Sequence, residues 1–137
     1  MKDKDVATAA RELIDAPYAL GNPESGWDCV SMCLHFYDNL GISLPREFKG
    51  YSAENYAERW KKGEGREELR DYLMSLGVEV EANYERAGDL LIFDAEKWVF
   101  PGIYLGSNHF LAAFEKGCMV VPYRFFKKAV IGRRRLA

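Results

Sequence analysis

The sequence predicts an α+β fold, with N-terminal helices packed on a C-terminal antiparallel sheet of about five or six strands. Apolar residues recur at helical spacing in the first half, whereas short alternating or apolar runs between turn residues fill the second half. Hydrophobic residues make up 48% of the chain and aromatic residues 14%, which is enough to form a core. The length of 137 residues suits one domain covering residues 1–137.

The first helix is expected from about Asp5 to Ala16. Asp3 or Asp5 is its candidate N-cap, and Pro17 follows its end. Its apolar face carries Val6, Ala9, Ala10, Leu13 and Ile14. The segment therefore predicts an amphipathic helix with one face in the core.

A second helix is expected over residues 29–40, after a loop rich in Pro, Gly, Asn and Ser over residues 17–27. Asp28 stands at the N-cap position, and Gly41 suits the position just after the last turn. Cys29 is therefore expected in the first turn of this helix.

An extended connection over residues 42–51 leads to two further helices. Ser52 is placed to cap a helix over residues 53–62. The next helix covers residues 66–76 and ends before Gly77, with an apolar side formed by Leu69, Leu73 and Leu76.

The second half predicts a meandering antiparallel sheet whose strands are separated by turn residues. The expected strands cover residues 78–82, 89–93, 102–106, 110–114, 119–123 and 129–134. Basic residues gather at the end of this region, and we interpret them as a solvated edge or terminal strand: Arg124, Lys127, Lys128, Arg133, Arg134 and Arg135.

The charge and composition of the chain limit the classes of partner and cofactor that we expect it to bind. The 19 basic and 21 acidic residues give a net charge of −2 and no general footprint for nucleic acid. The first 15 residues lack the apolar run of a signal peptide, and no later stretch predicts a membrane span. We expect a cytoplasmic protein as synthesised. With three cysteines, two histidines and no metal-ligand spacing, we expect no disulfide framework, no metal and no cofactor.

Cys29 is the candidate nucleophile. The positive end of the helix dipole and the free N–H groups of the first turn both stabilise a thiolate over a thiol. The alternative is a small buried hydrophobic residue, which is the usual role of a free cysteine. Cys33, one turn further along, and Cys118, in a strand-like run, are interpreted as core residues.

Five segments follow one another in a recognisable order: Pro17-Tyr18 with Gly21, Trp27-Asp28-Cys29, Gly41-Ile42-Ser43-Leu44-Pro45, Ala87-Gly88-Asp89-Leu90-Leu91-Ile92-Phe93 and Gly102-Ile103-Tyr104-Leu105-Gly106. Together they resemble the NlpC-type cell-wall cysteine peptidases over nearly the whole chain, which implies a papain-like fold. Two further segments, Gly50-Tyr51-Ser52 and Ile131-Gly132-Arg133, resemble the subgroup encoded in prophage tail modules.

The resemblance implies a hydrolase of peptidoglycan stem peptides with Cys29 as nucleophile. It also implies that Asp28 holds the free amine of the substrate and that Tyr18 borders the cleft. The family has a histidine base two residues before Gly-Ile-Tyr and an orienting histidine on the next strand. This chain has Phe100 and Ala112 at those positions, and we expect both to contribute to the binding cleft. Ser31 stands where the family usually has glycine.

Neither histidine is well placed to replace the missing base. His109 lies three residues before Ala112, so in one strand the two side chains point to opposite faces. A tight turn over residues 106–108 would also put His109 at a hairpin tip. His35 follows Cys29 by six residues, which is about 240° around a helix after whole turns are removed. His109 nevertheless remains the nearest substitute base.

The sequence thus favours a protein with impaired catalysis. Without an imidazolium, Cys29 has only the helix dipole, worth ~0.3–1 kcal/mol, and Asp28 opposes it. Loss of general acid–base catalysis lowers the reaction rate by a factor of roughly 10² to 10⁴. The main hypothesis is a degenerate peptidase-like protein that binds a peptide, stem peptide or protein partner in a cleft made more apolar by Trp98 and Phe100. The alternatives are an active cysteine hydrolase using His109 and a phage-tail or assembly component, which would be virion-associated.

Overall fold

A six-stranded antiparallel sheet forms the centre of the fold and confirms the predicted α+β class. The computed structural model describes residues 2–22, 24–49, 51–53, 55–95 and 98–136. The strands lie side by side in the order β3 (Val78–Glu79), β8 (Val130–Arg135), β4 (Leu90–Ala95), β5 (Trp98–Gly106), β6 (His109–Phe114) and β7 (Gly117–Pro122). Each expected strand of the second half is confirmed as a member of this sheet.

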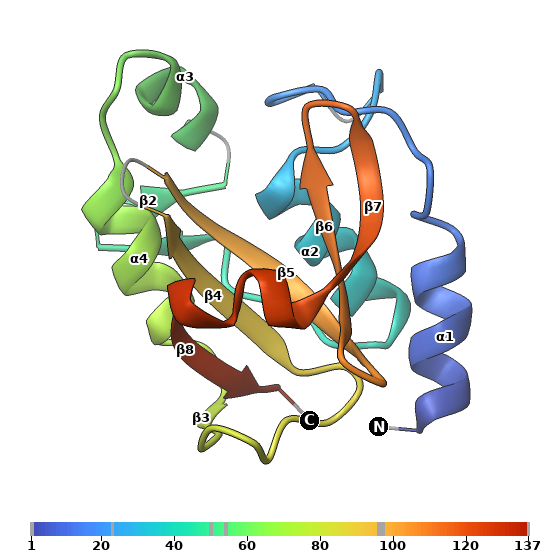
Figure 1. The fold of residues 1–137 in the computed structure, drawn as a ribbon. Coiled ribbons are helices and arrows are strands. Elements are labelled where there is room, and N and C mark those ends of the chain that lie inside the picture. Colours follow the sequence, from blue (N-terminus) through green and yellow to red (C-terminus); the bar gives the residue numbers. More distant parts are fainter. Residues whose placement is uncertain (1, 23, 50, 54, 96–97, 137) are drawn as a thin grey trace.

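Four helices accompany the sheet in the described part of the chain: α1 (Asp3–Arg11), α2 (Cys29–Asn39), α3 (Tyr56–Lys61) and α4 (Arg66–Met74). Figure 1 shows α1 at the right edge of the view, α2 behind the strands near the centre, and α3 and α4 at the left. Buried residues of α1, α2 and α4 form one core cluster with the sheet face that carries Ile92, Ile103 and Leu111. This cluster fixes the beginning of α2, and with it Cys29, against the sheet.

Helix α1 is shorter than expected at its C-terminal end. It begins after Lys2, whose side chain makes no cap, and ends at Arg11 rather than near Ala16. Asp15 has a left-handed φ of 67° and donates its N–H to the Cys118 carbonyl, so the chain leaves the helix to meet β7. Ile14, expected on the apolar face, is 38% exposed.

Helix α3 is also shorter than predicted, because it starts later. Ser52 pairs with Glu47 in a two-stranded ribbon formed by β1 (Glu47–Phe48) and β2 (Tyr51–Ser52), so it is not the cap of α3. Asn55 takes the N-cap position instead, without a side-chain bond. Pairing of the extended connection has therefore shortened the helix to six residues.

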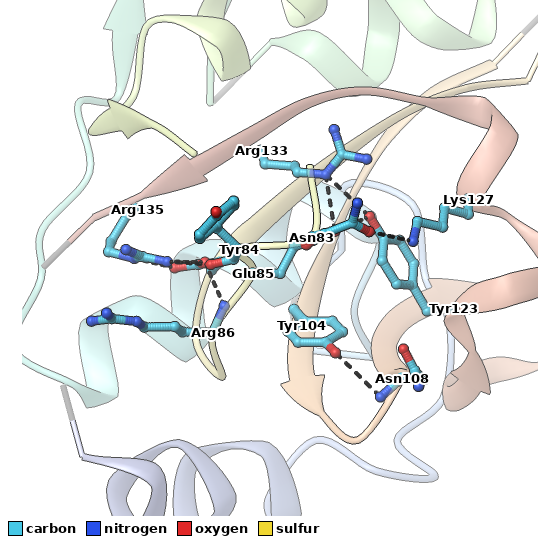
Figure 2. Close-up of polar contacts among 11 residues, drawn as sticks. Asn83, Tyr84, Glu85, Arg86, Tyr104, Asn108, Tyr123, Lys127, Arg133 and Arg135 are labelled. Atoms are coloured by element: carbon cyan, nitrogen blue, oxygen red, sulfur yellow. Dashed lines mark hydrogen bonds and ion pairs between the residues drawn. The ribbon is translucent and has the colours of Figure 1, made fainter. Parts of the chain in front are cut away.

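The basic C-terminal strand is not a solvated edge. Strand β8 lies between β3 and β4. Its Arg133 side chain pairs with Glu85 at 3.0 Å, and Figure 2 shows both pointing toward Tyr123. Arg135 pairs with the buried Asp89 at 2.8 Å. The edge alternative is therefore wrong for β8, because Arg133 and Arg135 neutralise carboxylates that the fold buries. β8 is the last strand of the chain, and the other basic residues of this region, Arg124, Lys127 and Lys128, are exposed as expected.

The opposite face of the sheet carries a second core cluster. Leu91, Phe93, Phe110 and Ala112 are fully buried there. The short helices η1 (Tyr123–Phe125) and η2 (Lys127–Ala129) lie across this face (Figure 1), and Phe126 between them packs on the cluster. Among the described residues no helix combines the length and apolar character that a bilayer crossing requires.

Candidate functional site

The N-terminus of α2 is held by a capping box. The Asp28 carboxylate accepts hydrogen bonds from the backbone N–H groups of Val30 at 3.0 Å and Ser31 at 2.8 Å. In return, the Ser31 hydroxyl accepts a bond from the Asp28 N–H at 3.0 Å. The predicted cap is confirmed, and Cys29 is the first residue of the helix. Ser31, the departure from the family's glycine, is thus part of the cap.

Asp28 also ties two other segments to the cap. Its second carboxylate oxygen accepts from the Gly21 N–H at 2.8 Å and from the Tyr56 hydroxyl of α3. Gly21 has a left-handed φ of 68°, and a Cβ there would lie 2.7 Å from the Ala57 Cβ. The fully buried Asp28 carboxylate therefore meets four donors of the protein itself. Its binding of a substrate amine stays a prediction.

The surroundings of Cys29 favour the neutral thiol. Burial, reinforced by the negative charge of Asp28, raises the pKa of Cys29 to about 12. The backbone N–H groups of Cys29 and Val30 lower this pKa, as expected at a helix start, but by less than burial and Asp28 raise it. At pH 7 the sulfur is a thiol, in agreement with the expectation from the sequence.

A cavity of about 250 Å³ opens beside Cys29. Its walls are mainly aromatic, from Tyr18, Trp60, Trp98, Phe100 and Phe114. Ala95, Val99, Ala113 and Glu115 complete the lining. The structure thus brings together four of the residues expected at the site, namely Tyr18, Cys29, Trp98 and Phe100.

The strand register decides which side chains face α2. Val99 and Ala113 belong to the cluster against which Cys29 packs. Phe100 and Ala112, one residue away along each strand, pack in the cluster on the other face. Phe100 still reaches the cavity from there, but Ala112 is fully buried and does not line it. A role for Ala112 in binding stays a prediction.

Both histidines are engaged outside the cavity. His35, in α2, stacks on Trp27 with ring centroids 4.5 Å apart, and its Nε2 lies 3.3 Å from the Asn39 amide. His109 is exposed at the start of β6, and its Nδ1 bonds the Ser107 carbonyl at 2.8 Å. Ser107 has a positive φ of 51°, as in the tight turn expected before His109. Neither imidazole is among the described residues that line the cavity.

Several cavity residues could not be picked out from the sequence. Trp60 comes from α3 and Glu115 from the turn between β6 and β7, so only the folded chain brings them near Cys29. Val99 could have been identified as a cavity residue from the alternation of side chains along β5, because it is the neighbour of Phe100 and points to the opposite face of the sheet. Cys33 and Cys118 are buried, which confirms their assignment to the core. Within the described ranges no three His, Cys, Asp or Glu side chains are grouped so that they could hold a metal ion.

Comparison with known proteins identifies relatives of this fold. The sequence model of the NlpC/P60 family matches residues 15–135. No curated protein matches the sequence. The NlpC/p60 domain of the peptidoglycan hydrolase SagA superposes with a TM-score of 0.66 at 18% identity, covering 99% of this chain and 100% of that domain.

Two other solved structures are similar. RipD from Mycobacterium tuberculosis, described as a non-catalytic NlpC/p60 domain protein adapted to peptidoglycan binding, gives a TM-score of 0.68 at 17% identity, covering 98% of this chain and 97% of that one. An NlpC/P60 family protein from Bacillus cereus gives 0.69 at 19% identity over 98% of this chain, which spans 40% of that protein. At these identities the likeness establishes the fold.

Proposed function

Because this chain belongs to the NlpC/P60 family, we propose that it is a degenerate cysteine peptidase-like protein that binds a peptide beside Cys29 without efficient hydrolysis. The observation that carries this proposal is the lining of the cavity. The strands that would have to present a base to the sulfur carry apolar side chains there, those of Val99, Phe100 and Ala113. A general base must come within about 2.6–3.2 Å of the proton that it accepts, directly or through one water.

The electrostatics support the same proposal. With a pKa of about 12, Cys29 is almost wholly protonated at neutral pH, and the thiolate is the nucleophilic form. Both imidazoles are engaged outside the cavity, His35 against Trp27 and His109 against the Ser107 carbonyl, so neither is placed to remove this proton. A bound peptide would therefore stay intact.

Peptidoglycan stem peptides are the proposed ligand class. SagA is a peptidoglycan hydrolase, and RipD is described as a peptidoglycan-binding protein without catalysis. This chain keeps the fold and has a partly exposed apolar cavity. Both features favour a protein that still binds such peptides but no longer cleaves them. The proposed contacts are those of the cavity lining, with Tyr18 and Trp98 at its border.

The test measures binding and cleavage on the same samples. Purified protein is incubated with γ-D-glutamyl-diamino acid stem peptides and with insoluble peptidoglycan, and products are followed by mass spectrometry. We expect binding with intact peptide, equal binding by Cys29→Ala, and loss of binding by Trp98→Ala. Product formation by the wild type that is absent from Cys29→Ala would instead establish an active cysteine hydrolase. Absence of binding at millimolar peptide would refute the binding role.

An active hydrolase is the second candidate, because Cys29 retains the helix-start position and the two backbone N–H groups that lower its pKa. A third candidate is an assembly component of the prophage tail-module subgroup. It rests on the sequence resemblance at Gly50-Tyr51-Ser52, of which Gly50 lies outside the described residues, and at Ile131-Gly132-Arg133. A lone monomer in size-exclusion chromatography and no captured partner would argue against it.

A further inference from the structure

Positive charge is concentrated at the C-terminal end of the chain. The last 22 residues contain seven basic residues, whereas all 21 acidic residues precede Lys116. Three of the seven act inside the fold, because Arg133 and Arg135 pair with buried carboxylates and Arg134 donates to backbone carbonyls. Three of the remaining four lie together in the short helices η1 and η2, on the face of the sheet opposite α2.

The three cations of η1 and η2 are exposed. They are Arg124, Lys127 and Lys128. Among the described residues no carboxylate forms an ion pair with any of them. Lys127 donates a hydrogen bond to the side-chain oxygen of Asn83 at 2.9 Å, which leaves its charge in place (Figure 2). Their combined charge is therefore available to an anionic partner.

An aromatic side chain lies among these cations. Phe125 is 69% exposed, and the Arg124 guanidinium lies over its ring at 4.9 Å from the centroid. The neighbours of Phe125 anchor the backbone, since Tyr123 is 2% exposed and donates to Glu85, and Phe126 packs on the second core cluster. The fold therefore presents Phe125 to solvent from an anchored segment. We call the following four residues the η patch: Arg124, Phe125, Lys127 and Lys128.

The composition of the η patch fits the surface of an anionic bilayer. In that interface lysine and arginine contact lipid phosphates, while an aromatic ring enters the boundary between headgroups and acyl chains. Proteins that bind single-stranded nucleic acid instead stack successive bases on several aromatic rings along a basic groove. The η patch has one ring, and the acidic remainder of the chain would repel a long polyanion. A flat bilayer touches one face only, so acidic groups farther away than the Debye length of about 8 Å oppose it little.

We infer that the η patch binds an anionic membrane surface, with Phe125 inserted at the headgroup boundary and the three cations on lipid phosphates. None of the four patch residues lines the cavity beside Cys29, so this surface is separate from the binding site of the proposed function. A surface contact of this kind needs no membrane-spanning helix. It therefore agrees with the described helices, none of which could cross a bilayer.

The test is co-sedimentation of the full chain with lipid vesicles. Vesicles of phosphatidylcholine alone are compared with vesicles of phosphatidylcholine and phosphatidylglycerol in equal amounts, and lipid is titrated to about 5 mM. We expect the partition coefficient to be at least about tenfold higher for the anionic vesicles. This difference should shrink as NaCl is raised from about 0.1 to 0.5 M. Equal partitioning into both kinds of vesicle would overturn the inference.

Variants of the η patch test its two contributions. Lys127→Gln combined with Lys128→Gln should lower partitioning into anionic vesicles about 25-fold, since each cation near such a surface contributes about fivefold. Lys127→Arg combined with Lys128→Arg keeps the charge and should partition like the wild type. Phe125→Ser should lower partitioning about fivefold, because apolar contact with the acyl boundary is lost.

Matched controls lie elsewhere on the surface. Lys4→Gln combined with Arg11→Gln removes the same charge from exposed positions of α1. Val78→Ser removes an apolar side chain that is 63% exposed on β3. Both controls should partition within about twofold of the wild type. If they weaken binding as much as the patch variants do, net charge or general surface character determines binding and the inference falls.

Polyphosphate distinguishes a bilayer from a dissolved polyanion, because it carries phosphates without an acyl phase. We expect Phe125→Ser to weaken binding to anionic vesicles and to leave any binding of polyphosphate unchanged. Vesicle binding that is insensitive to Phe125→Ser would contradict insertion of the ring and would assign the η patch to dissolved polyanions instead. Failure of this inference leaves the binding of stem peptides untouched, and failure of the stem-peptide test leaves the vesicle result untouched, since the two surfaces share no residue.

Discussion

The Tyr56 hydroxyl donates a hydrogen bond to the Asp28 carboxylate and so joins helix α3 to the N-terminus of α2. Burial, followed by the negative charge of Asp28, raises the pKa of Tyr56 far above its ordinary value, so the phenol stays a neutral donor. Trp60 lies four residues further along α3 and lines the cavity. The cap of the nucleophile helix therefore also positions one wall of the cavity.

Replacement of Tyr56 by phenylalanine should destabilise the protein. The variant removes a donor from a buried carboxylate, and bonds of this kind contribute about 1.5–3 kcal/mol. We expect a loss of that size in the free energy of unfolding, measured by urea denaturation. Tyr84→Phe, at a side chain that is 69% exposed, is the matched control and should change stability by less than about 0.5 kcal/mol. Equal stability of the two variants would contradict the structural role of this bond.

Cys29 should react slowly with alkylating agents at neutral pH. Its pKa is raised to about 12, whereas a free cysteine has a pKa of about 8.5. We expect iodoacetamide to modify Cys29 at least about 100-fold more slowly than a cysteine peptide at pH 7, with the rate rising about tenfold per pH unit up to pH 10. Peptide mapping by mass spectrometry separates Cys29 from Cys33 and Cys118. Rapid modification at pH 6 would contradict the raised pKa.

Introduction of an imidazole at Val99 should activate the sulfur. Val99 and Cys29 line the same cavity and belong to the same core cluster, so Val99→His would bring a titratable cation near the thiolate and lower the pKa of Cys29. We expect alkylation of Cys29 at pH 7 to become about tenfold faster, which corresponds to a fall of about one pKa unit. Val99→Leu controls for altered packing and should not accelerate the reaction. An unchanged rate in Val99→His would mean that this position does not face the sulfur.

Local signals in the sequence were sufficient to place Cys29. Asp28 and Gly41 define the ends of α2 through their own backbone and side-chain chemistry, and the structure has the helix between them. The strands of the second half were predictable for a similar reason, since turn residues separate them. Ser31 departs from the glycine usual in the family, yet it completes the cap.

Tertiary contacts account for what the sequence did not predict. Ser52 has the local chemistry of a helix cap, but it pairs with Glu47 in the β1–β2 ribbon instead of capping α3. Trp60 and Glu115 reach the cavity only because α3 and the β6–β7 turn meet near Cys29. The basic residues of β8 looked solvent-facing because their acidic partners, among them Glu85, lie more than 40 residues away in the sequence.

The ion pair between Glu85 and Arg133 should make the free energy of unfolding depend on pH in the acidic range. The side chains are 5% and 15% exposed, and Tyr123 donates a second bond to the same carboxylate at 2.7 Å. Burial alone would raise the pKa of Glu85, but the bonds from Tyr123 and Arg133 prevail and lower it. The ionised form therefore stabilises the folded state above the unfolded pKa of about 4.3, and this contribution is lost as pH falls through the lower folded pKa.

Replacement of Glu85 by glutamine leaves Arg133 partly buried without its counter-charge. We expect a loss of about 2–3 kcal/mol in unfolding free energy at pH 7, below the full cost of a broken buried pair because Arg133 retains some solvent contact. The difference from the wild type should shrink as pH falls below the unfolded pKa of about 4.3 and through the lower folded pKa, because Glu85 itself then becomes neutral. Glu79→Gln on β3 should instead follow the wild type within about 0.5 kcal/mol at every pH. A constant difference between Glu85→Gln and the wild type from pH 7 to pH 2 would show that lost packing, rather than the lost charge, causes the effect.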